Sequence, residues 1–190
     1  NLIFSAMSLR KKWRHYRDNR SLSSGLIWLT EANWVRAEKA LLSNVEHSDT
    51  PVVSYIAAAK AAHMQEAYDR RDEWLKLALQ YDQKAHLAVG VSQAEMQLGA
   101  NQLEQAYATL KNLWKLKSKH PYVVKLLARV LYRRESWDEL LDLLPDLLNL
   151  AVLKPEDMNR VELATLTGMF KKQIKEGGSI KLQALWKRLP

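Results

Sequence analysis

A recurrence interval of 34 to 35 residues constrains the fold of this 190-residue chain more than any other feature of its sequence. The interval separates four large side chains, each next to a helical pattern rich in small and apolar positions. They are Trp34, Tyr68, Leu103 and Trp137, spaced by 34, 35 and 34 residues. About ten residues before each one stands a small residue, which allows two helices to approach closely. These small residues are Gly25, Ala59, Ala94 and Ala128. An interval of this length is typical of a helix-turn-helix repeat.

Proline positions and composition support the same architecture. Pro51, Pro121 and Pro155 each stand where a helix is expected to begin, and proline is tolerated in the first turn because its missing N–H would be unpaired there anyway. Only 6 glycines and 5 prolines interrupt a chain dominated by good helix formers. The sequence therefore predicts an all-α fold, a tetratricopeptide (TPR)-type α-α superhelix built as a solenoid of antiparallel helix pairs.

Three segments follow from these signals. Residues 1–20 are expected to form a basic juxtamembrane segment or helix start, residues 21–154 about four TPR-like repeats, and residues 155–190 a further helical pair that continues in the full-length protein. In the last segment we expect a helix to about Glu176, a break at two glycines, and an amphipathic stretch from residue 179 to 189. Pro145 lies inside a leucine-rich helical pattern and predicts a bend or a restart of that helix.

The charge of the chain is concentrated near its start. The net charge is +8, and residues 10–20 hold six basic residues against one acidic residue, which leaves 23 basic and 20 acidic residues elsewhere. This nearly neutral remainder argues against nucleic-acid binding. A basic run after Asn-Leu-Ile-Phe is typical of the cytoplasmic flank of a membrane helix. The alternative is an artificial N-terminal stretch followed by a solvated basic helix start. The sequence contains no run of about 18 apolar residues, the length that a membrane-spanning helix needs.

No catalytic signature occurs in the sequence. Phosphate-binding, dinucleotide-binding, zinc-protease and serine-hydrolase motifs are all missing, and so is cysteine, which excludes disulfides and thiolate metal sites. Acidic residues such as Asp138, Glu139 and Asp142 are predicted on exposed helix faces. We therefore expect a protein that is not an enzyme and that needs no cofactor or metal.

The candidate ligand-binding residues lie on the first helix of each repeat, because that helix lines the concave side of such solenoids. In the fourth repeat, Val123, Val124, Leu127, Ala128, Val130 and Leu131 are predicted to be buried. The opposite face carries Tyr122, Lys125, Arg129, Tyr132 and Arg133 at three- and four-residue spacing. Lys60 and His63 in the second repeat and Glu95 in the third complete the set. They predict a basic, partly apolar groove for an acidic or amphipathic peptide, a carboxylate or a porphyrin; the alternative is a merely solvated face.

Two other residue types permit a functional interpretation. His63 and Met64 offer imidazole and thioether, which are both haem ligands, but neither a second ligand nor an attachment motif is present, so His63 is only a weak haem candidate. The tryptophans are interpreted as helix packing and not as a platform for bases. They are Trp28, Trp34, Trp74, Trp114 and Trp137.

Four runs in the chain resemble the HemY family, a bacterial inner-membrane TPR family associated with late steps of protohaem synthesis. They span residues 25–38, 54–62, 68–75 and 119–129, and the likeness covers roughly residues 10–190. The resemblance implies two membrane helices ahead of a repeat domain on the cytoplasmic side of the inner membrane. It also implies a scaffold that acts in late haem (porphyrin) biosynthesis, with other proteins, including haem-biosynthesis enzymes, as partners. The alternatives are a direct haem- or porphyrin-binding carrier or chaperone, and RNA binding. A flavin-dependent protoporphyrinogen oxidase of the same name is unrelated, because its dinucleotide fingerprint is missing here.

Overall fold

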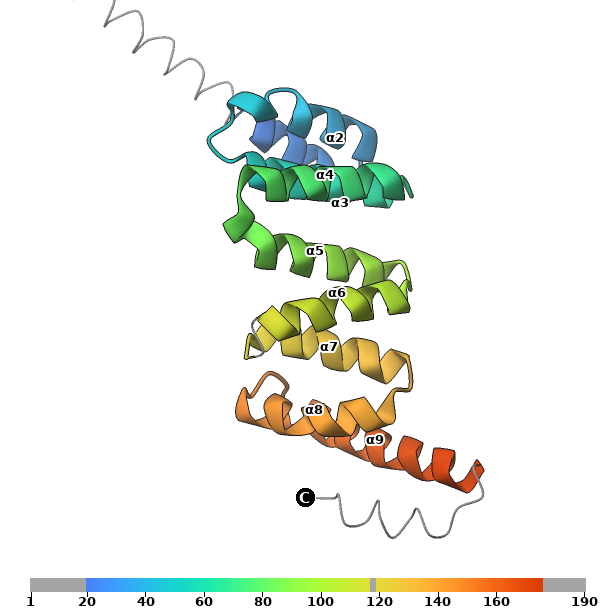
Figure 1. The fold of residues 1–190 in the computed structure, drawn as a ribbon. Helices are drawn as coiled ribbons and strands as arrows, with labels where there is room; N and C mark the ends of the chain where they lie inside the picture. Colours follow the sequence, from blue (N-terminus) through green and yellow to red (C-terminus); the bar gives the residue numbers. More distant parts are fainter. Residues whose placement is uncertain (1–19, 117–118, 176–190) are drawn as a thin grey trace, which may run out of the picture. The chain divides into compact units, whose positions relative to one another are not determined.

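A computed structural model describes residues 20–116 and 119–175 of the chain. All regular elements in these ranges are helices (Figure 1), which confirms the predicted all-α class. The chain divides into two compact units, one up to Met96 and one from Gln97 onward, and each is described by itself. The domain boundaries at residues 20 and 154 remain a prediction. The basic run before Arg20, the glycine break and the amphipathic stretch from residue 179 lie outside the described residues.

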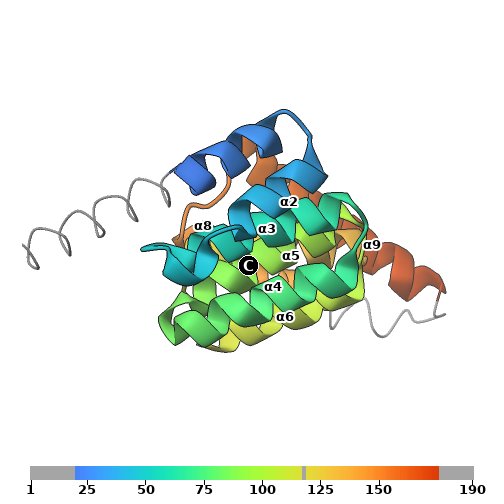
Figure 2. The ribbon, with the colours of Figure 1, turned by 90° about the horizontal axis from the view of Figure 1, so that it is seen from above.

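The first unit consists of antiparallel helix pairs (Figure 2). A helix over residues 20–30 precedes α2 (Trp34–Leu42), α3 (Pro51–Met64) and α4 (Tyr68–Tyr81), and short 3₁₀ turns occupy η1 (Val45–His47) and η2 (Gln83–Ala85). The helix α5 (His86–Gly99) begins in this unit. Its core contains Tyr55, Ala59 and Leu75, with Val89 from α5. A second cluster joins Ala37 and Leu41 of α2 to the alanines of α3.

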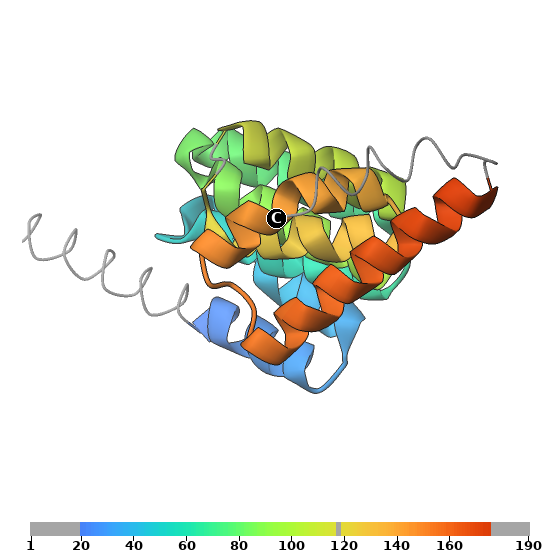
Figure 3. The same ribbon diagram turned by 90° about the horizontal axis from the view of Figure 1, so that it is seen from below.

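The second unit contains α6 (Leu103–Leu116), α7 (Pro121–Arg133), α8 (Trp137–Asn149) and α9 (Pro155–Lys175). Consecutive helices pack against each other, and α9 runs along α8 (Figure 3). The six residues predicted to be buried on α7 are all buried, together with Leu126. The buried face of α7 therefore lies in the core of this unit.

Four equivalent turns each connect the first helix of a pair to the second. Trp34, Tyr68, Leu103 and Trp137 are the first residues of α2, α4, α6 and α8. Two residues earlier in each case the backbone is left-handed, at Ala32, Glu66, Asn101 and Glu135, with φ of 58°, 59°, 60° and 54°. The next amide donates to a carbonyl five residues back in every turn: Asn33 to Trp28, Ala67 to Ala62, Gln102 to Gln97 and Ser136 to Leu131, at 2.8 to 3.0 Å. This is the Schellman arrangement that closes a helix C-terminus. The interval of 34 to 35 residues in the sequence is therefore the spacing of a repeated turn.

Close helix contact at the small residues is also observed. A Cβ atom built on Gly25 would lie 2.4 Å from Cγ of Leu41, so no larger residue fits there without a shift. Ala59 and Ala94 are fully buried, and Ala128 is 4% exposed. The prediction that these positions allow close packing is confirmed.

The prolines predicted at helix starts lie there, and Pro145 lies inside a helix. Pro51, Pro121 and Pro155 are the first residues of α3, α7 and α9. Pro145, however, does not restart its helix, because α8 runs without interruption from Trp137 to Asn149. Pro145 is exposed, while Leu144 before it and Leu147 after it are buried. Burial of leucines on both sides holds the helix together, and the proline ring faces solvent.

A buried carboxylate ties three segments of the first unit together. Glu38 on α2 is 8% exposed and accepts hydrogen bonds from Nε1 of Trp74 at 2.9 Å and from Nε2 of Gln65 at 2.7 Å. Arg70 donates to both of its oxygens, at 3.0 and 3.2 Å. Burial by itself raises the pKa of Glu38, but these hydrogen bonds and the Arg70 charge outweigh it and lower the pKa.

Replacement of Glu38 by Gln therefore changes both the stability and its pH dependence. At pH 7 we expect Glu38→Gln to lose about 2 kcal/mol of unfolding free energy, because the Trp74 and Arg70 donors lose a charged acceptor. The lowered folded-state pKa means that the Glu38 contribution is present above its unfolded pKa of about 4.3 and is lost as the pH falls through the folded value. Urea titrations from about pH 7 to pH 3 should show a smaller acid loss in Glu38→Gln than in the wild type. The exposed Glu73→Gln on α4 is the control; an identical acid loss in wild type and Glu38→Gln would refute the assignment.

Candidate functional site

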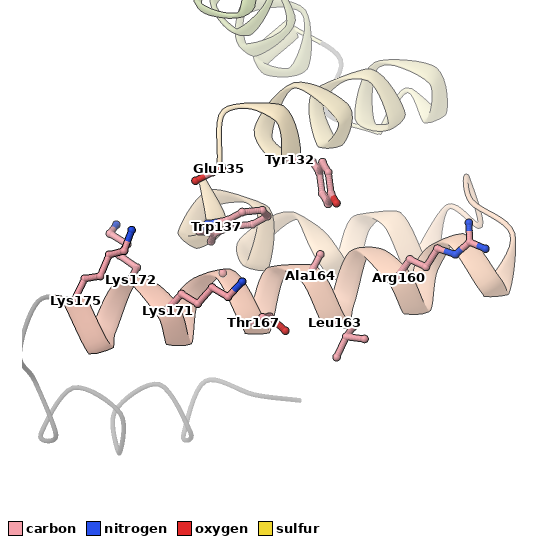
Figure 4. Close-up of a pocket in the computed structure, with 11 residues that line it drawn as sticks. Tyr132, Glu135, Trp137, Arg160, Leu163, Ala164, Thr167, Lys171, Lys172 and Lys175 are labelled. Atoms are coloured by element: carbon pink, nitrogen blue, oxygen red, sulfur yellow. The ribbon is translucent and has the colours of Figure 1, made fainter.

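A cavity of about 820 Å³ lies in the second unit between the end of α7, the start of α8 and one side of α9 (Figure 4). Its lining combines aromatic, basic and apolar side chains. They are Tyr132, Glu135, Trp137, Arg160, Leu163, Ala164, Thr167, Gly168, Lys171, Lys172 and Lys175. All of these residues belong to the same unit. The cavity volume lies within the range of ordinary ligand pockets.

Two aromatic rings form one wall of the cavity. The centroids of Tyr132 and Trp137 lie 5.7 Å apart with an interplanar angle of 89°, the favourable edge-to-face geometry. Gly168 of α9 lies directly against Trp137, and a Cβ atom there would come within 2.3 Å of the indole ring. The turn at Glu135 thus places both rings, and the missing side chain at Gly168 lets α9 approach them.

The lining carries four basic side chains and one carboxylate, Glu135. Nζ of Lys172 lies 3.1 Å from Oδ2 of Asp138, and Nη1 of Arg160 lies 3.6 Å from Oδ1 of Asp157. The side chains of both pairs are half-exposed or more, so these ion pairs contribute little and leave the cations able to meet an anion. The site therefore favours a ligand with negative charge and an apolar part.

A charge cluster on α6 and α8 stabilises the turn behind the cavity. Glu139 accepts hydrogen bonds from the hydroxyl of Tyr107 at 2.6 Å and from Nζ of Lys111 at 3.0 Å. Arg134 donates to both carboxylate oxygens of Glu104 at 2.8 and 2.9 Å, and its guanidinium lies 4.1 Å from the Tyr107 ring centroid. Burial raises the pKa of Glu139, but the two hydrogen bonds and the charges of Lys111 and Arg134 together outweigh it and lower the pKa. The hydrogen bond to Glu139 raises the pKa of Tyr107.

The predicted residues of α7 are exposed, but they do not all face the cavity. Tyr132 lines it, whereas Tyr122, Lys125 and Arg129 lie along the exposed side of α7 ahead of it. Arg133 is already engaged: its guanidinium donates to the carbonyl of Leu98 and to Oδ1 of Asn101, both at 2.9 Å. Arg133 thus clamps α7 to the preceding turn.

The predicted residues of the first unit form a separate group. Lys60 and His63 lie on α3 and Glu95 lies on α5, all before residue 97. Lys60 and Glu95 are exposed and His63 is half-buried. A single groove that includes these residues and those of α7 remains a prediction, because the two units are described separately.

His63 lies next to Arg71 and Tyr68. Its Nδ1 lies 3.5 Å from a guanidinium nitrogen of Arg71, and its ring lies 5.7 Å from that of Tyr68. Burial and, to a lesser degree, the Arg71 charge lower the pKa of His63 and favour the neutral ring. Nδ1 therefore faces a group that can only donate a hydrogen bond. The role of His63 as a haem candidate stays a prediction. Met64 next to it is 47% exposed.

All four basic residues of the cavity are absent from the residues predicted from the sequence. Trp137 was interpreted as a repeat marker and packing residue, and the cations of α9 lie beyond the four predicted repeats. A signal for them exists, because Arg160, Lys171 and Lys175 recur on α9 at intervals of 11 and 4 residues, which keeps them on one helix face. No group of three or more His, Cys, Asp or Glu side chains suited to a metal occurs in the described part of the chain. In residues 20–116 and 119–175, no helix is long and apolar enough to cross a membrane.

Helix pairs closed by four equivalent turns at a 34- to 35-residue interval define a helical-repeat protein of TPR type. The family model described as HemY protein N-terminus matches residues 1–66. Protein HemY of Escherichia coli K12 and Protein HemY of Shigella flexneri are each 26% identical to the chain over 171 residues, which cover 90% of the chain and 43% of the relative. These matches confirm the predicted resemblance to the HemY family. The chain spans less than half the length of these relatives.

Solved structures of MamA share the fold. MamA of AMB-1 aligns with a TM-score of 0.53 at 19% identity, over 89% of this chain and 97% of that chain. A point mutant of MamA gives the same TM-score at 20% identity, over 89% of this chain and 98% of that chain. Likeness at this level of identity supports the repeat fold and nothing more specific.

The contact between Gly168 and Trp137 can be tested with two alanine variants. We expect Gly168→Ala to lower the unfolding free energy by about 1 to 3 kcal/mol, because the added methyl group displaces the indole. A methyl group added to Gly99, at the end of α5, would meet no neighbouring group within 4 Å. Gly99→Ala should therefore be neutral or stabilising by up to about 1 kcal/mol, since alanine is the better helix former. Urea unfolding followed by tryptophan fluorescence measures both; equal effects of the two variants would contradict the contact.

Proposed function

We propose that the chain is the docking domain of a non-enzymatic scaffold in late haem (porphyrin) biosynthesis, and that it holds partner proteins against α7 and α9. The observation that carries this proposal is the basic cavity with an aromatic wall in the second unit. Repeat proteins bind partners through the helix surfaces that their stacking leaves exposed. Aromatic and arginine side chains are enriched among the residues that dominate such interfaces.

The composition of the cavity supports binding over catalysis. Its cations and its Tyr132 hydroxyl can donate hydrogen bonds to an anion, as interfaces that recognise acidic motifs do. The single carboxylate of the lining, Glu135, lies on the left-handed turn and is exposed. Nothing in this set pairs a nucleophile with a base, so the site is suited to hold a partner.

The pathway and the location rest on the family. The likeness to Protein HemY supports a role beside enzymes of haem synthesis. The basic run of residues 10–20 supports an orientation on the cytoplasmic side of the bacterial inner membrane, behind an N-terminal anchor. The chain spans 43% of this relative, so both statements belong to the proposal.

In-cell cross-linking from the proposed surface tests this function. A photoreactive amino acid at Arg129 or Tyr132 of the intact, anchored protein should capture one or more haem-pathway enzymes, identified by mass spectrometry. The same probe at Gln105, an exposed position on α6, is the matched control and should not capture them. If neither Arg129 nor Tyr132 yields a haem-pathway protein, or if Gln105 yields the same ones, the scaffold proposal fails.

A further inference from the structure

The cations of the cavity lie at its two ends. Arg160, Ala164, Thr167, Lys171 and Lys175 follow one another on α9 at three- and four-residue intervals, which forms one helix face. At a rise of 1.5 Å per residue, Arg160 and Lys175 start about 22 Å apart along the helix. Figure 4 shows Arg160 toward one end of α9, Lys172 and Lys175 toward the other, and the two aromatic rings between them. The cavity is therefore an elongated trough with basic ends and an aromatic middle.

We propose that this trough binds one extended acidic segment of a partner protein, about six or seven residues long, with carboxylates at both ends and an apolar side chain in the middle. The inference rests on the proposed function and specifies the chemistry of the partner. It follows from the spacing of the charges, from the exposed apolar surface between them, and from the sign of the charge.

The spacing of the charges favours a peptide over a compact anion. An extended chain advances about 3.3 to 3.6 Å per residue, so about 22 Å corresponds to six or seven residues. Acidic residues at both ends of such a segment reach Arg160 and the lysine group together. A compact ligand with its carboxylates on one edge satisfies only one of the two basic ends.

The middle of the trough favours an apolar side chain. Tyr132 is 46% exposed and Leu163 is 68% exposed, although both line the cavity. Burial of an aliphatic side chain against Tyr132 and Trp137 contributes favourable transfer free energy that offsets the cost of ordering the segment. The apolar contact therefore provides binding energy, and the charged ends set the direction and length of the ligand.

The charge of the trough argues against its occupation by the end of this same chain. Residues 176–190 contain Lys181, Lys187 and Arg188 but only one acidic residue, Glu176. Like charges repel in a site that holds four cations and one carboxylate. A partner with several acidic residues is the complementary occupant.

Fluorescence anisotropy with three labelled heptapeptides on the full chain tests the inference. The first, acetyl-Glu-Glu-Ala-Leu-Ala-Glu-Glu-amide, has split charges; the second carries all four glutamates at one end; the third replaces the central leucine with serine. We expect the first peptide to bind at least about tenfold more tightly than each of the others, which corresponds to about 1.4 kcal/mol. Its affinity should fall with added salt because the ends are charged.

Variants at both ends of the trough complete the test. Arg160→Gln and the double variant Lys171→Gln/Lys175→Gln should each weaken the first peptide about tenfold. Lys115→Gln on α6 and Lys76→Gln on α4 are the matched controls and should leave it unchanged. These positions are all exposed, so circular dichroism should show an unaltered fold. Equal binding of all three peptides, no binding by any, or an affinity insensitive to Arg160→Gln overturns the inference.

A porphyrin titration distinguishes a porphyrin from an acidic peptide segment as the ligand of the trough. If protoporphyrin gives a saturable Soret shift that is lost in Lys171→Gln/Lys175→Gln but kept in Arg160→Gln, and if it displaces the first peptide, the trough is a porphyrin site and the inference is wrong. The peptide experiment and the cross-linking experiment can fail independently. Cross-linking of haem-pathway enzymes from Tyr132 together with the absence of peptide binding would reject only the extended acidic segment.

Discussion

The left-handed turn between paired helices is the constraint on which the structure depends. At Ala32, Glu66, Asn101 and Glu135 the backbone reverses within three residues, and the Schellman bonds of each turn satisfy carbonyls at the helix end. Left-handed backbone costs a non-glycine residue about 1 to 2 kcal/mol. The turns keep this conformation although none of them has glycine at the left-handed position, so the packing of the helices that they join must offset the cost.

The fourth turn also builds the candidate site. Tyr132 lies at the end of the first helix of the pair and Trp137 begins the second, so the turn at Glu135 brings their rings together at right angles. Arg134 in the same turn is fixed by Glu104 and by the ring of Tyr107. Because Gly168 carries no side chain, α9 packs against Trp137 and contributes its row of cations. A rigid turn on one side and a close helix on the other thus produce a basic cavity with an aromatic wall.

The sequence predicted the repeated turns and the buried face of α7, because both depend on local periodicity that a single chain displays. It did not predict the site as a whole, because Trp137 is more than 30 residues from Lys171 and Lys175 and meets them only through packing. Local rules left a bend or a restart open at Pro145, and buried leucines on both sides exclude the restart because α8 continues through it. Arg133 was expected to face a ligand, yet it donates to the turn at Leu98 and Asn101, 32 to 35 residues away. The spacing of residues along the sequence does not predict tertiary contacts of this kind.

Native-state hydrogen exchange at the turn amides tests the equivalence of the four turns most directly. The amides of Asn33, Ala67, Gln102 and Ser136 lie between helices, but each donates to a carbonyl five residues back. The account predicts that NMR will find all four protected from exchange to a degree similar to neighbouring helical amides. Exchange of any of these amides at the rate of an unstructured peptide would contradict the repeated turn, and with it the placement of Trp137 against α9.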